Sequence, residues 1–280
     1  MELHHRYNVT NIIGIRYGFQ GLIPQYGHEI LTLTPETVKD IHTGGGSMLA
    51  SSRGNQDIGA MVTALKRMNV DLFFCIGGDG TMRAAGLLAD EVLRRNLNIS
   101  VIGIPKTIDN DLAVTDHCPG YGSAARFIAL ATRDAGLDLE AMSTFEDVSI
   151  LEAMGRNAGW LAAASSLAKT SEADAPHLVF IPEQTFDENS FLDAVSNIHK
   201  RLNRVFIVAC EGLRDANGDF VGAHQMKETK DAFGHTLNTF TTGVAAYLSE
   251  LVNKSLGLRA RFLRPVIIGR AMSACISKVD

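Results

Sequence analysis

The sequence lacks the features that mark secreted, membrane-bound and nucleic-acid-binding proteins. Its four cysteines are widely spaced with no C-x-x-C pair, which argues against a disulfide framework and a zinc site. No apolar run approaches the roughly 18 residues that a transmembrane helix needs, and the opening MELHHRYN has no apolar core of a signal peptide. The net charge is −5, whereas nucleic acids and membrane surfaces attract clustered positive charge. We therefore expect a cytoplasmic protein that binds neither nucleic acid nor membranes.

What is present is an alternation of short apolar runs with segments of helical periodicity. The 280 residues, 46% of them hydrophobic, are enough for one large domain or two moderate ones. The alternation is typical of βαβ units around a parallel sheet. We predict an α/β fold of two doubly wound, Rossmann-like parallel-sheet domains, with a boundary near residues 117–123.

The same patterns predict where the elements lie. Strands are expected at 11–18, 71–78, 99–105, 147–154, 177–182, 204–212 and 262–269. Helices are expected at 34–41, 57–68, 81–95, 121–142, 157–169, 188–202 and 235–257. In such folds ligands bind beyond the carboxyl ends of the strands. Four polar motifs follow predicted strands: GGDGT (77–81), PKTIDND (105–111), MGR (154–156) and EG (211–212).

GGDGT links a predicted buried strand to a predicted helix and could bind an anion. Its glycines, Gly77, Gly78 and Gly80, allow close backbone approach, and the helix N-terminus offers N–H groups to a phosphate. Asp79 would repel a bare phosphate but could hold a magnesium ion that accompanies one. Thr81 completes the motif. A plain strand-to-helix turn is the alternative, and the absence of G-x-x-x-x-G-K-[ST] means that the chain is not a P-loop protein.

PKTIDND supplies side chains that phosphoryl transfer needs. One carboxylate of Asp109 and Asp111 could accept a proton from an attacking hydroxyl. Lys106 could neutralise charge on the moving phosphoryl group, and Thr107 could orient a phosphate or a carboxylate. A turn with solvated acids is the alternative interpretation.

Other charged residues lie at predicted strand ends. Arg156 in MGR suits phosphate or carboxylate recognition through its planar fork. Glu211 could hydrogen-bond sugar hydroxyls or be a solvated strand-end acid. Arg261 and Arg270 flank the segment FLRPVIIG, and the residues alone leave structural and functional roles equally open.

In this order and spacing, GGDGT, PKTIDND, MGRNAGW and CEG resemble the 6-phosphofructokinase family. The likeness covers nearly the whole chain, including GFQGL (18–22) and GGGSMLASSRG (44–54). NAD kinases and lipid kinases share the glycine–aspartate loop but not TIDND followed by MGR. The resemblance implies transfer of a phosphoryl group to the 1-hydroxyl of fructose 6-phosphate, a step of glycolysis, with Mg²⁺ as cofactor. Asp109 matches the family's catalytic base, and Thr107 and Asp111 match its partners at the reacting centre.

The resemblance also implies substrate and donor contacts. The residues that match sugar-phosphate contacts are Met154, Gly155, Arg156 and Glu211, with Arg270 at the 6-phosphate and Arg261 lent to a neighbouring subunit. The residues that match the donor-phosphate loop are Gly77, Gly78, Asp79, Gly80 and Thr81, with Asp79 at the magnesium position and Arg53 near the transferred phosphate. Residues 1–122 with 269–280 are thus expected to bind the donor and Mg²⁺, and 123–268 fructose 6-phosphate, in a homodimer or homotetramer.

Two positions bear on the choice of phosphoryl donor, and they favour different donors. Relatives that use pyrophosphate usually have an acidic residue at the position of Gly80, so the glycine favours ATP. Lys106 is typical of pyrophosphate enzymes but also occurs in a branch of ATP enzymes that have the glycine. We expect ATP, with pyrophosphate as the alternative.

The chain departs from the family in three ways. The opening strand and its glycine-rich loop are not found before MELHHRYN, and the sequence stops soon after Arg270. Ile267 replaces a polar residue near the sugar phosphate, and Asp147 lies where some relatives have a second-subunit arginine. Our expectation is a fragment, or a misjudged gene start, of an active enzyme. The alternative is an inactive relative that binds sugar phosphate without turnover.

Overall fold

The computed structural model describes residues 1–54, 56–222, 227–230, 236–239 and 243–277. The chain divides into two compact units, which we call unit 1 (Met1–Lys106 with Lys230–Thr236) and unit 2 (Thr107–Thr229 with Leu237–Asp280). The helices and strands of unit 1 are α1 (Glu2–Tyr7), β1 (Ile13–Ile15), β2 (Ile30–Thr32), α2 (Pro35–Val38), α3 (Ile58–Arg67), β3 (Leu72–Gly77), α4 (Asp79–Arg94) and β4 (Ser100–Pro105). Short 3₁₀ turns lie at Gly18–Leu22, Pro24–Tyr26 and Ile41–Thr43.

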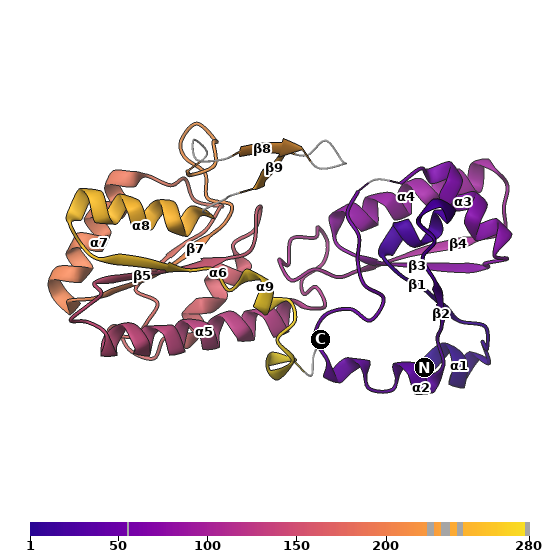
Figure 1. Ribbon diagram of the computed structural model, residues 1–280, viewed down its shortest axis with the longest axis horizontal. Helices are drawn as coiled ribbons and strands as arrows, with labels where there is room; N and C mark the ends of the chain where they lie inside the picture. Colours follow the sequence, from indigo (N-terminus) through magenta and orange to yellow (C-terminus); the bar gives the residue numbers. More distant parts are fainter. Residues whose placement is uncertain (55, 223–226, 231–235, 240–242, 278–280) are drawn as a thin grey trace. The chain divides into compact units, whose positions relative to one another are not determined.

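The parallel sheet of unit 1 pairs β3 with β4, from Leu72 opposite Ser100 to Gly77 opposite Pro105. Helix α4 packs on both strands and α3 packs on α4 (Figure 1). The buried side chains of these elements form one core, with Met61, Val62, Leu65, Cys75, Leu88 and Val92 at its centre. Strands β1 and β2 make a separate antiparallel pair. The sheet therefore directs the carboxyl ends of β3 and β4, where GGDGT and PKTIDND begin, to the same edge.

Unit 2 is built on a four-stranded parallel sheet in the order β10-β5-β7-β6. Its helices and strands are α5 (Tyr121–Ala141), β5 (Val148–Ala153), α6 (Trp160–Ala164), β6 (Leu178–Phe180), α7 (Glu188–Leu202), β7 (Val205–Cys210), α8 (Gly243–Leu256), β10 (Ala260–Leu263) and α9 (Val266–Gly269). Strands β8 (Lys227–Lys230) and β9 (Thr236–Thr239) form a separate two-stranded sheet, and 3₁₀ turns lie at Ser165–Ala168 and Ser273–Cys275.

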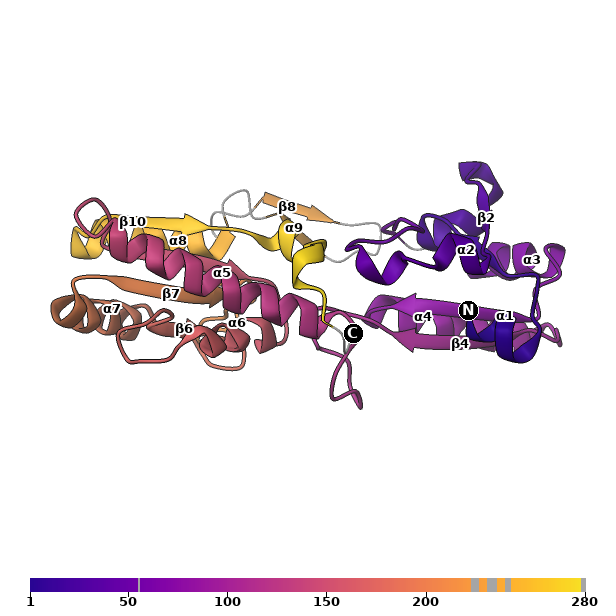
Figure 2. The ribbon, with the colours of Figure 1, turned by 90° about the horizontal axis from the view of Figure 1, so that it is seen from below.

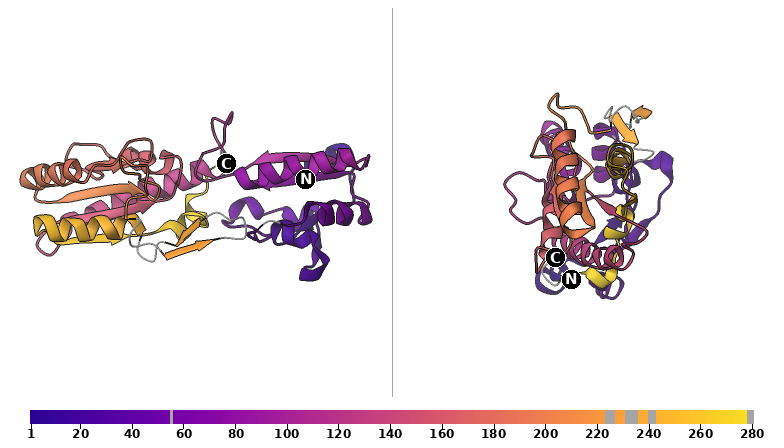
Figure 3. Two further views of the ribbon diagram at one scale, coloured as in Figure 1. Left: turned by 90° about the horizontal axis from the view of Figure 1, so that it is seen from above. Right: turned by 90° about the vertical axis from the view of Figure 1, so that its left-hand side faces the viewer.

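Helices cover both faces of the sheet of unit 2. Helix α5 lies along one face with α6, and α8 lies along the other with α7 (Figures 1 and 2). Figure 3 shows the same layers from two further sides. Every residue of β5 and β7 is buried, as expected for central strands covered on both faces.

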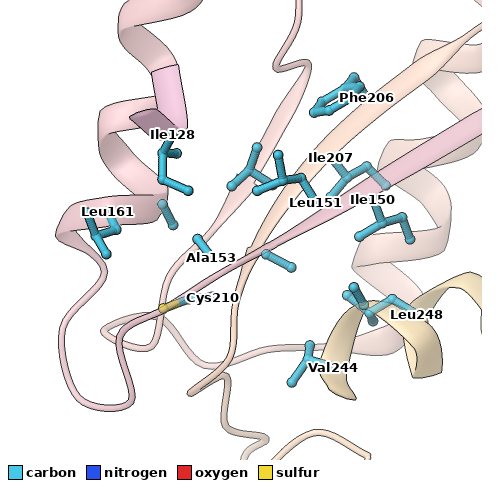
Figure 4. Packing of buried hydrophobic residues seen from close by; sticks show 14 of the residues in the cluster. Ile128, Ile150, Leu151, Ala153, Leu161, Phe206, Ile207, Cys210, Val244 and Leu248 are labelled. Atoms are coloured by element: carbon cyan, nitrogen blue, oxygen red, sulfur yellow. The ribbon is translucent and has the colours of Figure 1, made fainter. Parts of the chain in front are cut away.

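The core of unit 2 fills the space between these layers. Ile128 and Leu161 approach the sheet from one side, and Val244 and Leu248 approach it from the other (Figure 4). Each fully buried Leu or Ile stabilises the fold by about 1.5–3 kcal/mol relative to an exposed one. Because β5 and β7 are fixed by this packing, the residues that follow their carboxyl ends start from rigid supports.

Most predicted elements are present, and two are corrected. The strand predicted over 11–18 is only Ile13–Ile15, the helix over 34–41 is only Pro35–Val38, and the helix over 157–169 is Trp160–Ala164 followed by a 3₁₀ turn. The segment predicted as one helix over 235–257 contains β9 at Thr236–Thr239 and a helix from Gly243, because its first half is rich in β-branched threonine. The segment predicted as a strand over 262–269 is β10, which ends at Leu263, followed by α9. Pro265 lies between them and cannot donate to a sheet ladder.

The α/β class with parallel sheets is confirmed. The division into units differs in detail from the expected boundary, since unit 2 begins at Thr107 and includes the segment after residue 268. The assignment of donor and sugar binding to particular residue ranges stays a prediction. Within the described part of the chain, no helix is both long and apolar enough to span a bilayer.

Candidate functional site

The carboxyl ends of β5 and β7 bring two predicted site motifs together in unit 2. Met154, Gly155 and Arg156 follow β5, and Glu211 follows β7. The strands pair up to Ala153 opposite Cys210, and the Glu211 N–H donates to the Ala153 carbonyl at 2.9 Å. Nε of Arg156 lies 3.9 Å from Oε1 of Glu211. A cation and a carboxylate are thus held side by side at the sheet edge where ligands bind in this fold class.

The backbone of the MGR turn is fixed by close contacts. Gly155 has φ +120°, and a side chain there would collide with the Ala158 carbonyl. The Cys210 thiol donates to the Gly155 carbonyl, with Sγ 2.7 Å from the oxygen. A Cβ at Gly212 would collide with the Arg156 backbone. These contacts hold the backbone of Arg156 while its side chain stays exposed.

The PKTIDND loop is held by a buried asparagine. Asn110 is 6% exposed and has φ +54°, a conformation that asparagine tolerates better than most residues. Its Nδ2 donates to the Asp116 carbonyl at 3.1 Å, and its Oδ1 accepts the Cys118 N–H at 2.8 Å. The Thr107 hydroxyl oxygen accepts the Asp109 N–H at 3.2 Å. Two side chains therefore fix the loop immediately before and after Asp109, while Asp111 is exposed.

Asp109 has the electrostatic properties of a base. Burial raises the pKa of Asp109 to about 6, with further raising by the charges of Asp111 and Glu211, whereas Arg156 and Arg270 lower it. Its Oδ1 is buried and has no hydrogen-bond partner among the described residues. A buried carboxylate oxygen without a donor is costly, so this atom is suited to accept a hydrogen bond from a ligand.

Arg270 and Arg261 occupy different surroundings. Arg270 is exposed, and its charge acts on Asp109. Arg261 lies on β10 and contacts carboxylates of its own chain: its guanidinium bonds Glu146 at 2.9 Å, Ser149 at 3.0 Å and Asp138. Its predicted contribution to a neighbouring subunit stays a prediction.

The remaining predicted residues lie in unit 1, most of them in the turn from β3 to α4. Gly78 is the N-cap of α4, and a Cβ at Gly77 would collide with the Thr81 side chain. A Cβ at Gly80 would meet nothing within 4 Å. The 16-residue α4 begins here, so its N-terminal N–H groups and dipole favour an anion at this turn.

Two predicted cations belong to the same unit. The Lys106 N–H donates to the Gly77 carbonyl at 2.8 Å, which ties the end of β4 to the glycine loop. Arg53 lies in the irregular segment before α3, and its side chain is exposed. The structure thus places Lys106 beside GGDGT, within unit 1, while Thr107 and the acids that follow belong to unit 2.

Asp79 is the residue predicted to hold a magnesium ion. No group of three or more His, Cys, Asp or Glu side chains converges on a metal position among the described residues. Asp79 is exposed in the first turn of α4, and its carboxylate lies 3.2 Å from Nη2 of Arg83. Magnesium is usually held by one or two carboxylates together with substrate phosphates. Asp79 therefore fits Mg²⁺ that arrives with a phosphate donor.

Sequence reasoning missed several residues that support the site. Cys210 and Asn110 belong to quoted motifs but were given no role, although an asparagine between two loop acids is a signal of left-handed backbone. Glu183 accepts the Gly159 N–H at 2.8 Å and so holds the end of the MGRNAG turn, and no local pattern marks it for this contact.

Comparisons with known proteins agree with the fold and the motifs. The family model described as phosphofructokinase matches residues 2–276. The chain is 33% identical to the pyrophosphate--fructose 6-phosphate 1-phosphotransferase of Rhodospirillum rubrum, covering 98% of this chain and 68% of the relative. It is 40% identical to the ATP-dependent 6-phosphofructokinase of Entamoeba histolytica, over 76% of this chain and 47% of the relative.

A solved structure is also similar. The pyrophosphate-dependent phosphofructokinase from Marinobacter aquaeolei superposes with a TM-score of 0.80 at 28% identity, covering 98% of this chain and 64% of that one. The chain therefore spans about half to two thirds of the length of these relatives. Because the family model matches almost the whole sequence, this chain belongs to the phosphofructokinase family.

Proposed function

We propose that the protein transfers a phosphoryl group to the 1-hydroxyl of fructose 6-phosphate, with Asp109 as general base. The observation that supports this most is the buried, unpartnered Oδ1 of Asp109 beside the charges of Arg156, Glu211 and Arg270. The sugar hydroxyl donates its proton to Asp109 as its oxygen forms the new bond to phosphorus and the bond to the donor's leaving oxygen breaks. A base with a pKa near 6 is ionised at neutral pH and still accepts a proton.

The acceptor side of the reaction is assigned to unit 2. Thr107 and Asp111 orient Asp109 and the reacting phosphoryl group. Sugar-phosphate binding is assigned to Met154, Gly155, Arg156, Glu211, Arg261 and Arg270. The exposed fork of Arg156 and the adjacent Glu211 carboxylate supply a cation for phosphate and an acceptor for hydroxyls.

The donor side is assigned to unit 1. The residues proposed to bind the donor are Arg53, Gly77, Gly78, Asp79, Gly80 and Thr81. Asp79 would hold Mg²⁺, which supplies charge neutralisation on the donor phosphates when bound. Lys106, fixed beside Gly77, neutralises charge on the transferring group.

We propose ATP as the donor, with pyrophosphate as the second candidate. The open space at Gly80 supports ATP, because an acidic side chain there would repel the α-phosphate. Relatives named for each donor are similar to this chain, so the proposal of ATP rests on the glycine, while Lys106 is the feature that favours pyrophosphate. We further propose a homo-oligomer, a dimer or a tetramer, in which Arg261 reaches a neighbouring subunit.

The test is a coupled assay on the purified chain with fructose 6-phosphate and Mg²⁺, supplying ATP and pyrophosphate in parallel. Turnover with ATP supports the proposal, and turnover with pyrophosphate alone replaces the donor. If neither donor supports turnover but calorimetry shows fructose 6-phosphate binding, the chain is an inactive sugar-phosphate-binding relative under those conditions. Absence of both turnover and binding would refute the proposed function.

A further inference from the structure

Unit 2 contains a buried carboxylate that the proposed reaction does not use. Glu152 lies on β5, two residues before Met154, and is 0% exposed. Its Oε1 accepts a hydrogen bond from Nε of Arg264 at 2.9 Å, and its Oε2 accepts the Ala245 N–H at 3.0 Å. One carboxylate therefore joins β5, the start of α8 and the segment that follows β10.

The surroundings of Glu152 make this arrangement specific. A Cβ at Gly243, which has φ +79°, would collide with both the Glu152 carboxylate and the Arg264 guanidinium. Burial raises the pKa of Glu152, while the Ala245 N–H and the Arg264 charge oppose that effect. A charge in such a place is tolerated only when it is paired and hydrogen-bonded. A buried glutamate contributes less to packing than an apolar residue would, and its charge needs Arg264 as a partner.

Glu152 also lies next to residues that flank the candidate site. A small cavity of about 10 Å³ is lined by Ile108, Glu152, Met154 and Gly269, among other residues. Ile108 lies between Thr107 and Asp109, Met154 precedes Gly155, and Gly269 precedes Arg270. The three backbone segments that present the proposed base and the substrate contacts therefore meet next to Glu152.

We propose that Glu152 is a positioning residue for fructose 6-phosphate binding, which acts through Arg264 to hold the segment that ends at Arg270. Arg264 is the first residue after β10, and Pro265 and the short α9 connect it to Arg270. Anchoring the Arg264 guanidinium fixes the start of this connection relative to β5, so Arg270 and the MGR turn keep their relative positions. This inference rests on the proposed function, because it assigns Arg270 to the sugar phosphate.

The experiment uses the full chain and four variants, Glu152→Gln, Arg264→Gln, the double variant and Arg264→Lys. Isothermal calorimetry measures fructose 6-phosphate affinity without needing turnover, and steady-state kinetics separates KM from kcat. We expect each glutamine variant to raise Kd and KM for fructose 6-phosphate about tenfold with kcat nearly unchanged, since the loss equals about one charge-assisted contact. The double variant should match the single ones, because both remove the same link.

Two controls keep the result interpretable. Glu250→Gln makes the same substitution in α8, where Glu250 pairs with Lys254 on the surface, and it should leave Kd unchanged. Arg264→Lys retains a cation for Glu152 and should recover most of the lost affinity. If Glu152→Gln does not fold, Arg264→Gln and Arg264→Lys carry the comparison, since the Arg264 side chain is partly exposed.

The outcomes separate this inference from the proposed function. Variants that unfold more easily but bind fructose 6-phosphate as the wild type does would overturn the positioning role. A Kd of the double variant that is raised by the product of the two single effects would also overturn it, because the two residues would then act independently. A wild type that neither binds nor phosphorylates fructose 6-phosphate would instead refute the proposed function itself, and the role of Glu152 with it.

Discussion

Nε of Arg156 lies 3.9 Å from Oε1 of Glu211, at the ends of the paired strands β5 and β7. The two charges act on Asp109 in opposite directions. Burial is the main cause that raises the pKa of Asp109 to about 6; the negative charge of Glu211 adds to the rise, and the positive charge of Arg156 opposes it. Arg156 and Glu211 can be substituted one at a time. The direction in which each substitution shifts the pKa of Asp109 therefore tests whether Asp109 is the base.

As pH is lowered, kcat/KM for fructose 6-phosphate should fall with an apparent pKa near 6, because Asp109 becomes protonated. Glu211→Gln removes a charge that raises this pKa, so the fall should move to lower pH. Arg156→Gln removes a charge that lowers it, so the fall should move to higher pH. Each shift should be about 0.5–1 pH unit.

Both variants also remove proposed substrate contacts, so we expect kcat/KM itself to drop in each. The position of the acid limb, not the height of the profile, is the relevant measurement. If both substitutions moved the limb in one direction, or if no limb occurred near pH 6, Asp109 would not be the titrating base.

Asp109 should destabilise the folded protein at neutral pH. Its folded pKa is about 6 against an ordinary value of 3.8, so the unfolded state ionises first as pH rises. The resulting loss of stability is absent below about pH 3.8 and complete above about pH 6. Asp109→Asn should therefore raise Tm at pH 7.5 by roughly 5 °C and leave it unchanged at pH 3.5.

The matched control for this experiment is Asp193→Asn, which makes the same substitution on an exposed position of α7. Differential scanning calorimetry at the two pH values gives the comparison. An Asp109→Asn variant that is less stable than the wild type at pH 7.5 would show that the carboxylate has a stabilising partner in solution, contrary to the unpaired Oδ1.

Gly80→Asp should change donor preference without damaging the fold. A Cβ at Gly80 meets nothing within 4 Å, so the new side chain has space. Its negative charge at the N-terminal turn of α4 should repel the α-phosphate of ATP and lower kcat/KM for ATP at least about tenfold relative to pyrophosphate. Kinetics with both donors on the wild type and the variant measure this ratio. An unchanged ratio would mean that Gly80 does not select the donor.

Asn110→Ala should loosen the loop that presents Asp109. The substitution removes the acceptor for the buried Cys118 N–H and the donor to the Asp116 carbonyl. We expect the free energy of unfolding to fall by about 2–4 kcal/mol and kcat/KM to fall with it. Asn96→Ala is the control, because Asn96 has a similar φ of +51° but is exposed. Equal effects of the two substitutions on stability would assign the loss to backbone conformation instead of the side-chain bonds.

Much of the fold could be predicted because its central strands are short apolar runs. The segments predicted over 71–78, 99–105, 147–154 and 204–212 are β3, β4, β5 and β7, and their boundaries differ by one or two residues. In the two corrected segments, one residue type disfavours the structure that the hydrophobic pattern predicts. Threonine-rich sequence precedes α8, and Pro265 interrupts the apolar run after β10.

The candidate site could be predicted where its residues follow predicted strands. Strand-end motifs located Arg156, Glu211 and the acids of PKTIDND, because parallel strands present their carboxyl ends at one edge. The link between Glu152 and Arg264 joins residues 112 positions apart, and nothing in either local segment marks the partner. Arg261 contacts Asp138 and Glu146 across 123 and 115 positions, and the sequence did not indicate either partner.

The role of Asp109 as general base is tested by comparing kcat of Asp109→Ser with that of the wild type, while calorimetry measures fructose 6-phosphate binding by both. A general base contributes about 10²–10⁴-fold, so kcat should fall by that factor while Kd changes little. Loss of binding with unchanged turnover at saturating substrate would contradict the assignment, because Asp109 would then bind the sugar and another group would accept its proton.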